Sequence, residues 1–480
     1  MINLENPTRN HWIAIGKEIV SSIYEFFIII ILIATKLKWI YLIPLGILLL
    51  VFSIVKWRKT VFYIKDNMLF YEKGIFSKTR EQIPFNKITT VDMEQGPISR
   101  ILKLCTLKVD TGAALDIKAE VKITVKLEVA EEVKKEILKN KELDSDINIE
   151  EKNYIKATFK DLMIYALTKN KLGWILGAYV IFNQVKDFVS ESIIDSLNNN
   201  AEKIVTTIGN KIFNKQSVLF ITFYILIIFL ICYIIAATIS IIKENIQYHN
   251  FKLYKNKNKL NLEYGLFTKK RYSFPIKKIQ AIKLKQTAIQ QLLGLYTLEA
   301  VIIGYGDNDD KKAIIYPIAN EKLKNKIIEQ FLPKFKFDGQ IYKPRKRHIL
   351  KFITKRTLIT LGISIFILYF IHKVSVIWKI GLVVILSLIQ IILGYINYKN
   401  TLLGVSKENI IMSSGSITKI THLIKENTVQ SISKVQNPFQ RFSKVCTYKI
   451  DICTNLFGEV VTVKHLNENL INTLENNIEL

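Results

Sequence analysis

The chain has 480 residues, a hydrophobic fraction of 49%, a charged fraction of 23% and a formal net charge of +27. Its length predicts two to four domains, and this mixture is typical of soluble domains attached to a membrane-embedded part. In a soluble protein this positive charge would indicate binding to nucleic acid. Beside a membrane the anionic cytoplasmic leaflet is the nearer counter-charge, so no nucleic-acid partner is expected.

Cysteine and histidine usage argues against disulfides, metals and cofactors. The four cysteines, Cys105, Cys232, Cys446 and Cys453, lack the paired spacing of metal sites, and one lies inside an apolar run, so no disulfide framework is expected. The six histidines are scattered without HExxH or another ligand spacing. We therefore predict no metal site and no cofactor.

Membrane helices are predicted where about 20 apolar residues follow one another, because that length crosses a bilayer core of about 30 Å. Five runs are clear, at 19–35, 39–55, 217–242, 358–371 and 376–397. A sixth, 172–190, carries Lys186 and Asp187, and it is retained because five helices would place successive folded regions on opposite sides of the membrane. In this segment Gly173 and Gly177 form GxxxG, a helix-packing motif that serves either within the chain or between two copies.

The flanks of these segments differ in charge. Three basic residues follow the first pair, and seven lie between 343 and 356 before the fifth segment. The loop 187–216, on the opposite side, holds three Lys against four acidic residues. By the positive-inside rule, both termini and the folded regions face the cytoplasm. The sequence therefore predicts a multi-pass protein of the plasma (inner) membrane.

A ribbon-like sequence occurs three times. The copies align from Gly74, Gly265 and Gly415 without a gap for about 36 residues, which indicates a duplicated structural unit. Three further columns are identical in all copies: Lys78, Lys269 and Lys419; Gln95, Gln286 and Gln436; Thr106, Thr297 and Thr447. The glycine is expected to permit a hairpin turn, and the glutamine to bond backbone at a strand end.

Each copy reads as short strands followed by a helix. In the first copy, alternation and turn residues predict strands at 61–64, 68–72, 79–84, 88–94 and 104–110. Amphipathic helices are predicted at 128–143, 320–332 and 466–480. About seven strands capped by one helix would make a compact β-sandwich or barrel in each copy.

This organisation resembles the bacterial membrane-anchored pleckstrin-homology-like (PH-like) family across essentially the whole chain. The resemblance is carried by the strand–glycine elements MLFYEKGIF, KLNLEYGLF and IIMSSGSIT and by the strands IPFNKITTV, FPIKKIQAI and IKENTVQSI. It implies a non-enzymatic scaffold or adaptor, in envelope maintenance or stress tolerance. Its motifs are structural rather than catalytic, so the resemblance supports the fold more strongly than any activity. Lys103 and Lys444 depart from the family's glycine before the sixth strand, where the second copy has Gly294.

The predicted fold is an α+β membrane protein with six transmembrane helices in three pairs, each pair followed by a PH-like β-sandwich or barrel capped by a C-terminal helix. The predicted boundaries are 1–56 for the N-terminal tail and helices 1–2, 57–145 for domain 1, 146–243 for a linker and helices 3–4, 244–340 for domain 2, 341–398 for a basic linker and helices 5–6, and 399–480 for domain 3.

The second copy carries the strongest candidate binding site. Residues 243–356 include 26 Lys and Arg but 9 Asp and Glu, and a basic cluster beside a membrane can engage anionic lipid headgroups. Positive-inside topology and a Lys-rich composition are the alternative source of this charge. The candidate lipid contacts are Lys269, Lys270, Arg271, Lys277, Lys278, Lys283 and Lys285.

Three classes of function are weighed. The favoured one is a scaffold or adaptor whose cytoplasmic domains bind an as yet unidentified protein or lipid headgroups, since β-sandwiches expose strand edges for partner addition. The alternative is a transport or export component that uses the six-helix bundle. A membrane-tethered enzyme is the third, but no GxSxG, P-loop or Cys–His pairing supports it, so no catalytic residue is predicted.

Overall fold

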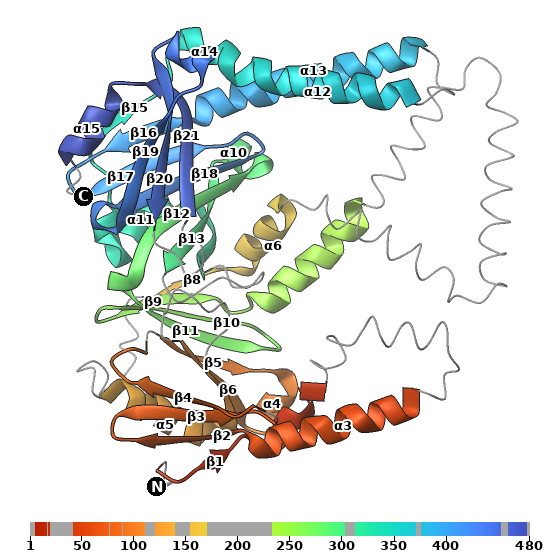
Figure 1. Cartoon of the computed structure of the whole chain (residues 1–480), viewed down its shortest axis with the longest axis vertical. Helices are drawn as coiled ribbons and strands as arrows, with labels where there is room; N and C mark the ends of the chain where they lie inside the picture. The colour runs from red at the N-terminus through yellow and green to blue at the C-terminus, as the bar shows by residue number, and fades with distance from the viewer. Residues whose placement is uncertain are drawn as a thin grey trace, which may run out of the picture. The chain divides into compact units, whose positions relative to one another are not determined.

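A computed structural model describes residues 5–16, 18–19, 42–75, 77–88, 90–110, 121–139, 154–169, 233–302, 313–370, 376–452 and 459–477 (Figure 1). Two compact units are distinguished. The first comprises Met1–Ala157 and Asn250–Leu480 and contains all three repeats. The second is Thr158–His249.

Each repeat in the first unit contributes seven strands, four and then three, followed by a helix. Repeat 1 has β1 (Thr8–Arg9), β2 (Val61–Lys65), β3 (Met68–Lys73) and β4 (Thr79–Pro84), then β5 (Thr90–Gln95), β6 (Leu104–Asp110), β7 (Val121–Lys126) and α5 (Leu127–Lys139). Repeat 2 has β8 (Tyr154–Lys156), β9 (Lys252–Asn256), β10 (Lys259–Tyr264) and β11 (Lys269–Pro275), then β12 (Ile279–Thr287), β13 (Leu295–Ile302), β14 (Ala313–Asn320) and α11 (Glu321–Phe331). Repeat 3 has β15 (Gln340–Tyr342), β16 (Leu402–Val405), β17 (Asn409–Ser414) and β18 (Thr418–Lys425), then β19 (Val429–Val435), β20 (Val445–Ile452), β21 (Glu459–Asn467) and α15 (Leu470–Asn477).

The sheets cross the boundaries between repeats. The three-stranded half of repeat 1 and the four-stranded half of repeat 2 form one sheet, in the order β7-β6-β5-β11-β10-β9-β8. Repeats 2 and 3 are joined in the same way, in the order β14-β13-β12-β18-β17-β16-β15. The remaining halves form a four-stranded sheet, β1-β2-β3-β4, and a three-stranded sheet, β19-β20-β21.

Alternating apolar residues explain how the layers pack. In repeat 1, buried side chains of the four-stranded half, such as Phe62 and Leu69, meet Leu107 and Ile123 from β6 and β7 and Val133 from α5. Side chains of alternate strand residues point to one face, so each strand supplies the core with every second residue. In repeat 3, the core takes in side chains from β12 and β13 of repeat 2, because the sheet continues between the repeats.

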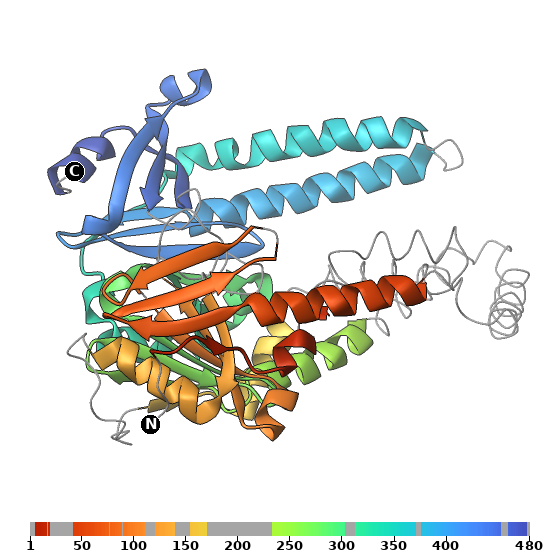
Figure 2. The same cartoon turned by 60° about the horizontal axis from the view of Figure 1, so that its bottom comes forward.

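Two long helices, α12 (Ile349–Phe370) and α13 (Val376–Asn400), precede the second strand of repeat 3 and run side by side (Figures 1 and 2). Phe352 near the start of α12 contacts Tyr398 near the end of α13, with ring centroids 5.8 Å apart. Residues Lys379–Asn400 are long and apolar enough to cross a membrane. Apolar side chains along both helices, including Ile363 and Ile380, are exposed.

The predicted fold of six transmembrane helices in three pairs, each followed by its own domain, is wrong. Among the described residues one helix, Lys379–Asn400, has the length and apolar composition of a membrane span. Helix α3 (Leu42–Lys59) ends in three basic residues, and α12 has three in its first turns, so charges fall within the length that a span requires. The two seven-stranded sheets also join consecutive repeats, so the strands of each repeat do not form a closed sandwich or barrel of their own. All of the predicted segment 172–190, all of 19–35 except its first residue, and most of 217–242 lie outside the described residues.

In the second unit, helix α6 (Phe159–Thr168) begins at a capping box, in which the Thr158 hydroxyl accepts from the Asp161 backbone and the Asp161 carboxylate accepts from the Thr158 backbone. Lys169 pairs with Glu244 at 2.6 Å, which links this helix to the helical residues 233–247. Gly173 and Gly177 lie outside the described residues, so the helix-packing role of this motif stays a prediction.

Candidate functional site at the junctions between repeats

The first junction pairs β5 with β11 in antiparallel register. Its three pairs are Lys269 with Gln95, Lys270 with Glu94 and Arg271 with Met93. The Gln95 amide donates to the Leu104 carbonyl at 2.9 Å, and Gln286 and Gln436 make the same bond to Leu295 and Val445 at 2.9 and 3.1 Å. The prediction that this glutamine bonds backbone at a strand end is therefore confirmed.

The seven predicted lipid-contact residues do not form one cluster. Lys269 and Arg271 lie on one face of β11, and Lys270 lies on the other, because side chains alternate along a strand. Lys277 and Lys278 are exposed in a short 3-10 helix, Ile276–Lys278. Lys283 and Lys285 lie on β12, which belongs to a different sheet.

Three members of this set pair with carboxylates. Lys283 contacts Glu459 at 2.7 Å, Lys285 contacts Glu299 at 3.8 Å and Arg271 contacts Glu263 at 3.7 Å. Burial opposes ionisation of Glu459, but the hydrogen bond with His422 and the charge of Lys283 outweigh it and lower its pKa to about 2. Lys283 and Glu459 come from repeats 2 and 3, so this pair helps to hold the second junction together. Lipid contact by the set stays a prediction, and the exposed Lys277 and Lys278 are its most accessible members.

Burial also affects the charges at the first junction. The Glu94 carboxylate contacts Lys108 at 2.6 Å and accepts from the Tyr272 hydroxyl at 3.1 Å. Burial opposes its ionisation, yet the charge and hydrogen bond of Lys108 hold its pKa below the usual range. Burial, and then the charge of Arg271, lower the pKa of Lys269. The carboxylate of repeat 1 therefore meets the basic strand of repeat 2 in a partly desolvated setting.

The second junction is longer. Strands β12 and β18 pair over seven positions, from Ala281 with Ile424 to Thr287 with Thr418. The Lys425 ammonium donates to the Ile279 carbonyl at 2.9 Å and lies 4.5 Å from the centre of the Phe335 ring. Burial, helped by the charge of Lys334, lowers the pKa of Lys425 to about 8.

At both junctions, the hairpin turn of one repeat contacts a short helix of the repeat before it. Arg100, in α4 (Pro97–Ile101), donates to the Leu266 carbonyl at 3.3 Å. Gln291, in α10 (Ala288–Leu293), donates to the Ser416 carbonyl at 3.0 Å. Both turns begin at a glycine with positive φ, 113° at Gly265 and 123° at Gly415, which confirms the predicted role of this residue.

The residue before the sixth strand has a positive φ in all three repeats. Gly294 has φ of 64°, and Lys103 and Lys444 have φ of 52° and 53° at the matching positions. Side chains disfavour this left-handed region. The two lysines that depart from the family pattern therefore keep the glycine's conformation.

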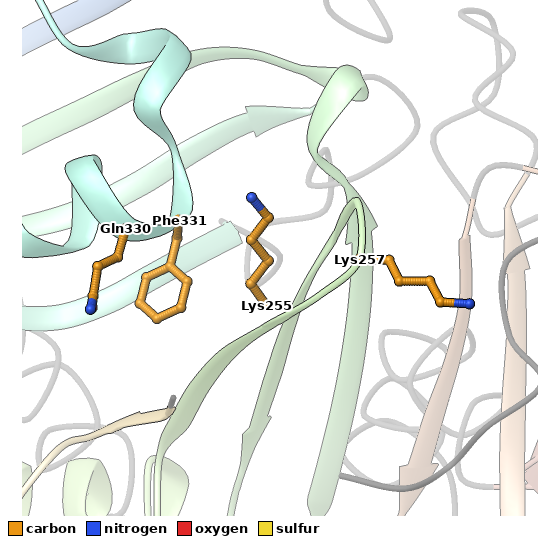
Figure 3. Close-up of a pocket in the computed structure, with 4 residues that line it drawn as sticks. All are labelled: Lys255, Lys257, Gln330 and Phe331. Carbon is orange, nitrogen blue, oxygen red and sulfur yellow. The ribbon is translucent and has the colours of Figure 1, made fainter. Parts of the chain in front are cut away.

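The described residues offer little to catalysis. They contain no group of three His, Cys, Asp or Glu side chains that could hold a metal ion. A pocket of about 270 Å³ is lined by Lys255, Lys257, Gln330 and Phe331. Figure 3 shows Lys255 beside Phe331, whereas Lys257 projects to the other side of the β9–β10 turn. Among these lining residues there is neither a carboxylate nor a hydroxyl or thiol nucleophile.

Sequence reasoning missed Lys425 and Glu459 and the small helices α4, α10 and α14 (Pro438–Arg441). Lys425 and Glu459 acquire their roles only through the pairing of β12 with β18. No side-chain motif in the sequence predicts that pairing. A signal for the helices did exist in the repeat alignment. Large apolar residues recur there at two columns separated by three positions.

The fold and the repeated junctions define a chain of consecutive PH-like units. The family model described as Bacterial PH domain matches residues 19–141, 216–325 and 358–479. The chain therefore belongs to the bacterial PH-domain family, as the resemblance implied. The UPF0699 transmembrane protein YdbT of Bacillus subtilis (strain 168) is 24% identical over 499 residues, which cover 97% of this chain and 96% of that protein. No solved structure matches the chain.

Proposed function

We propose that this chain is a non-enzymatic membrane scaffold that binds protein partners at free strand edges of its PH-like repeats. Membrane attachment is supported by the apolar span Lys379–Asn400 and by a relative named as a transmembrane protein. The repeats share sheets, so partners bound at different repeats would be held at a fixed spacing. The alternative of transport through a six-helix bundle is not retained, since it depended on the incorrect helix arrangement.

The main support for this proposal is that the same strand edges that join the repeats to one another are free at repeats 1 and 3, in the part of the chain that the structure describes. In repeats 2 and 3 the fourth strand, β11 or β18, pairs with the fifth strand of the preceding repeat, β5 or β12. Within the described residues, the corresponding fourth strand of repeat 1, β4, has β3 as its single neighbour. The fifth strand of repeat 3, β19, likewise has β20 alone. Unpaired edges of this kind present backbone donors and acceptors to another strand.

The free edges of β4 and β19 are structural counterparts of the two sides of a junction. Strand β4 matches the strands that receive a preceding repeat, and β19 matches the strands that receive a following one. A second copy of this chain therefore supplies the partner that suits each edge: its β19 would pair with β4 as β5 pairs with β11. Strand addition of this type gains affinity from backbone hydrogen bonds.

Photo-crosslinking in cells tests this arrangement. A benzophenone amino acid is placed at Gln82 in β4 or at Lys434 in β19, both exposed, and matched controls are placed in the exposed turns at Asp66 and Lys407. The expected result is an adduct between two copies, in which the probe at Gln82 captures a peptide from β19 and the probe at Lys434 captures one from β4. Equal capture at the turns, or no capture of these strands, would contradict the proposal.

A further inference from the structure

The helices α4, α10 and α14 occupy the same position in each repeat and have an inverted pattern of burial. The third residue of each helix is polar and buried, with 3% exposure at Ser99, 1% at Gln290 and 4% at Gln440. The second residue of each helix, and the residue three positions after it, are large, apolar and exposed. Their exposures are 64%, 42% and 79% at Ile98, Ile289 and Phe439, and 82%, 87% and 89% at Ile101, Leu292 and Phe442.

Hydrogen bonds hold two of these helices in this orientation. Gln290 donates to the Thr297 hydroxyl at 3.4 Å, and Gln440 donates to the Thr447 hydroxyl at 3.0 Å. Both glutamines also close a capping box with the residue that begins the helix. Because the polar side chain anchors the helix, the apolar pair faces mainly outward instead of into the core. A large apolar side chain that is repeatedly exposed in this way indicates a surface for an external apolar phase.

Contacts of α10 and α14 with the long helices indicate that this external apolar phase is a membrane. Asn400, the last residue of α13, donates to the Gln291 side chain of α10 at 2.8 Å. Lys351, near the start of α12, donates to the Phe439 carbonyl of α14 at 2.6 Å. The start of α12 lies beside the end of α13, so both short helices lie at one end of this helix pair.

The level of the membrane surface along α13 is indicated by its aromatic residues. Tyr395, which is half exposed, and Tyr398 precede Asn400 by five and two residues, or about 8 and 3 Å along a helix with a rise of about 1.5 Å per residue. Tyrosines mark the boundary between lipid and water at the ends of membrane helices. The apolar pair of α10 therefore lies beside the expected boundary.

We propose that α4, α10 and α14 insert their exposed apolar pairs into the interfacial region of the bilayer. This inference rests on the membrane attachment of the proposed function, but not on strand addition. Basic residues accompany two of the three helices and would contact anionic headgroups, Arg100 and Lys103 at α4 and Arg441 and Lys444 at α14. Exposed apolar residues of the neighbouring turns, Phe267 and Ile417, extend the surfaces of α4 and α10.

Nitroxide labels on the full chain test the insertion. Single cysteines replace Ile101, Leu292 or Phe442 in a cysteine-free variant, reconstituted in nanodiscs of phosphatidylcholine and phosphatidylglycerol. Collision with oxygen reports lipid, and collision with a nickel chelate reports water. A label at Val384 in α13 serves as the lipid reference, and one at the exposed Lys277 serves as the water reference. We expect the oxygen-to-nickel collision ratio at the three helix sites to be several-fold above that at Lys277.

The alternative outcomes separate the possible explanations. Nickel collision as frequent as at Lys277 would place the short helices in water and overturn the inference. Low collision with both reagents would indicate burial against a second copy or another protein, and would overturn it as well. A label at Val384 that behaves as water-exposed would instead contradict membrane attachment itself. The sites are highly exposed, so the labels have no core packing to disturb.

Discussion

The two junctions between repeats use equivalent strands, the fifth strand of one repeat and the fourth strand of the next, but they differ in length. Three residue pairs join β5 to β11, whereas seven join β12 to β18. Side chains reinforce the second junction at both ends, through Lys425 and Gln291. Duplicated repeats can therefore associate through the same pair of strand edges at each junction, while the number of residue pairs and side-chain bonds differs from one junction to the next.

One aligned position explains part of this difference. Lys425 in repeat 3 corresponds to Pro275 in repeat 2, six residues after the matching lysines 419 and 269. The lysine donates across the second junction to the Ile279 carbonyl, but proline has neither a side-chain donor nor a backbone N–H. Thr428 adds another bond there, to the Gln280 carbonyl at 3.1 Å. The second junction therefore continues where the first has ended.

The largest effect is expected from Gly415→Ala. A Cβ at Gly415 would lie 2.0 Å from the Thr418 carbonyl oxygen, and φ of 123° is unfavourable for alanine. Because the turn must move, we expect the local free energy of unfolding to fall by about 2–4 kcal/mol. Hydrogen exchange of the full chain in detergent, measured on peptides of β12 and β18, would report this loss.

Gly265→Ala is the matched change at the first junction, with the same clash at the Thr268 oxygen. Gly415 is also bonded to Asn397 and Asn400 of α13, so its displacement should increase exchange at the end of that helix. No such spread is expected from Gly265→Ala. Equal patterns of exchange in the two variants would contradict the proposed difference between the junctions.

A smaller effect is expected from Lys425→Ala. This change leaves the Ile279 carbonyl without its lysine donor, which should lower the free energy of unfolding at the second junction by about 1–3 kcal/mol. The pKa of Lys425 is about 8 in the folded chain and 10.5 when unperturbed, so the unfolded state binds more protons between these values. The wild-type junction should therefore gain stability as pH rises from 8 to 10.5, and the variant should lose that gain.

Exchange rates of β12 and β18 across this pH range, corrected for intrinsic exchange, would measure both effects. Lys407→Ala is a suitable control because Lys407 is an exposed lysine in the turn between β16 and β17. Its effect should stay within about 0.5 kcal/mol. A similar loss in both variants would show that the Lys425 contacts do not stabilise the junction.

These junctions also mark the limit of what the sequence predicts. Aligned columns predicted the turn at Gly265 and the backbone bond of Gln95, because both depend on local conformation. The pairing of β5 with β11 uses backbone atoms, which every residue possesses, so edge partners have no residue signature. The predicted basic residues also do not form one cluster, because the strand arrangement separates them. Lys270 and Lys283 are close in sequence, yet the break between β11 and β12 assigns them to different sheets.

The short helices were missed for a different reason. Apolar residues three apart, such as Ile289 and Leu292, are typical of the core-facing side of a helix, and the sequence gives no sign that this side is exposed. The intervening Gln290 decides the orientation, because its hydrogen bonds to the strand direct the apolar pair outward. A six-residue helix is too short for periodicity alone to distinguish the two orientations.

The smallest effect is expected from Lys444→Gly, which tests whether the repeats differ in stored backbone strain. Lys444 has φ of 53°, a conformation that costs a side-chain-bearing residue about 1–2 kcal/mol. Glycine removes that cost but loses more freedom on folding, so we expect a net gain of about 0.5–1 kcal/mol in the stability of repeat 3. The reciprocal change, Gly294→Lys, should destabilise repeat 2 by a similar amount, because φ is 64° there. Exchange of β20 and β13 peptides in detergent, away from any lipid contact of Lys444, would measure each change. Destabilisation by Lys444→Gly would mean that the contacts of the lysine side chain stabilise repeat 3 by more than its positive φ destabilises it.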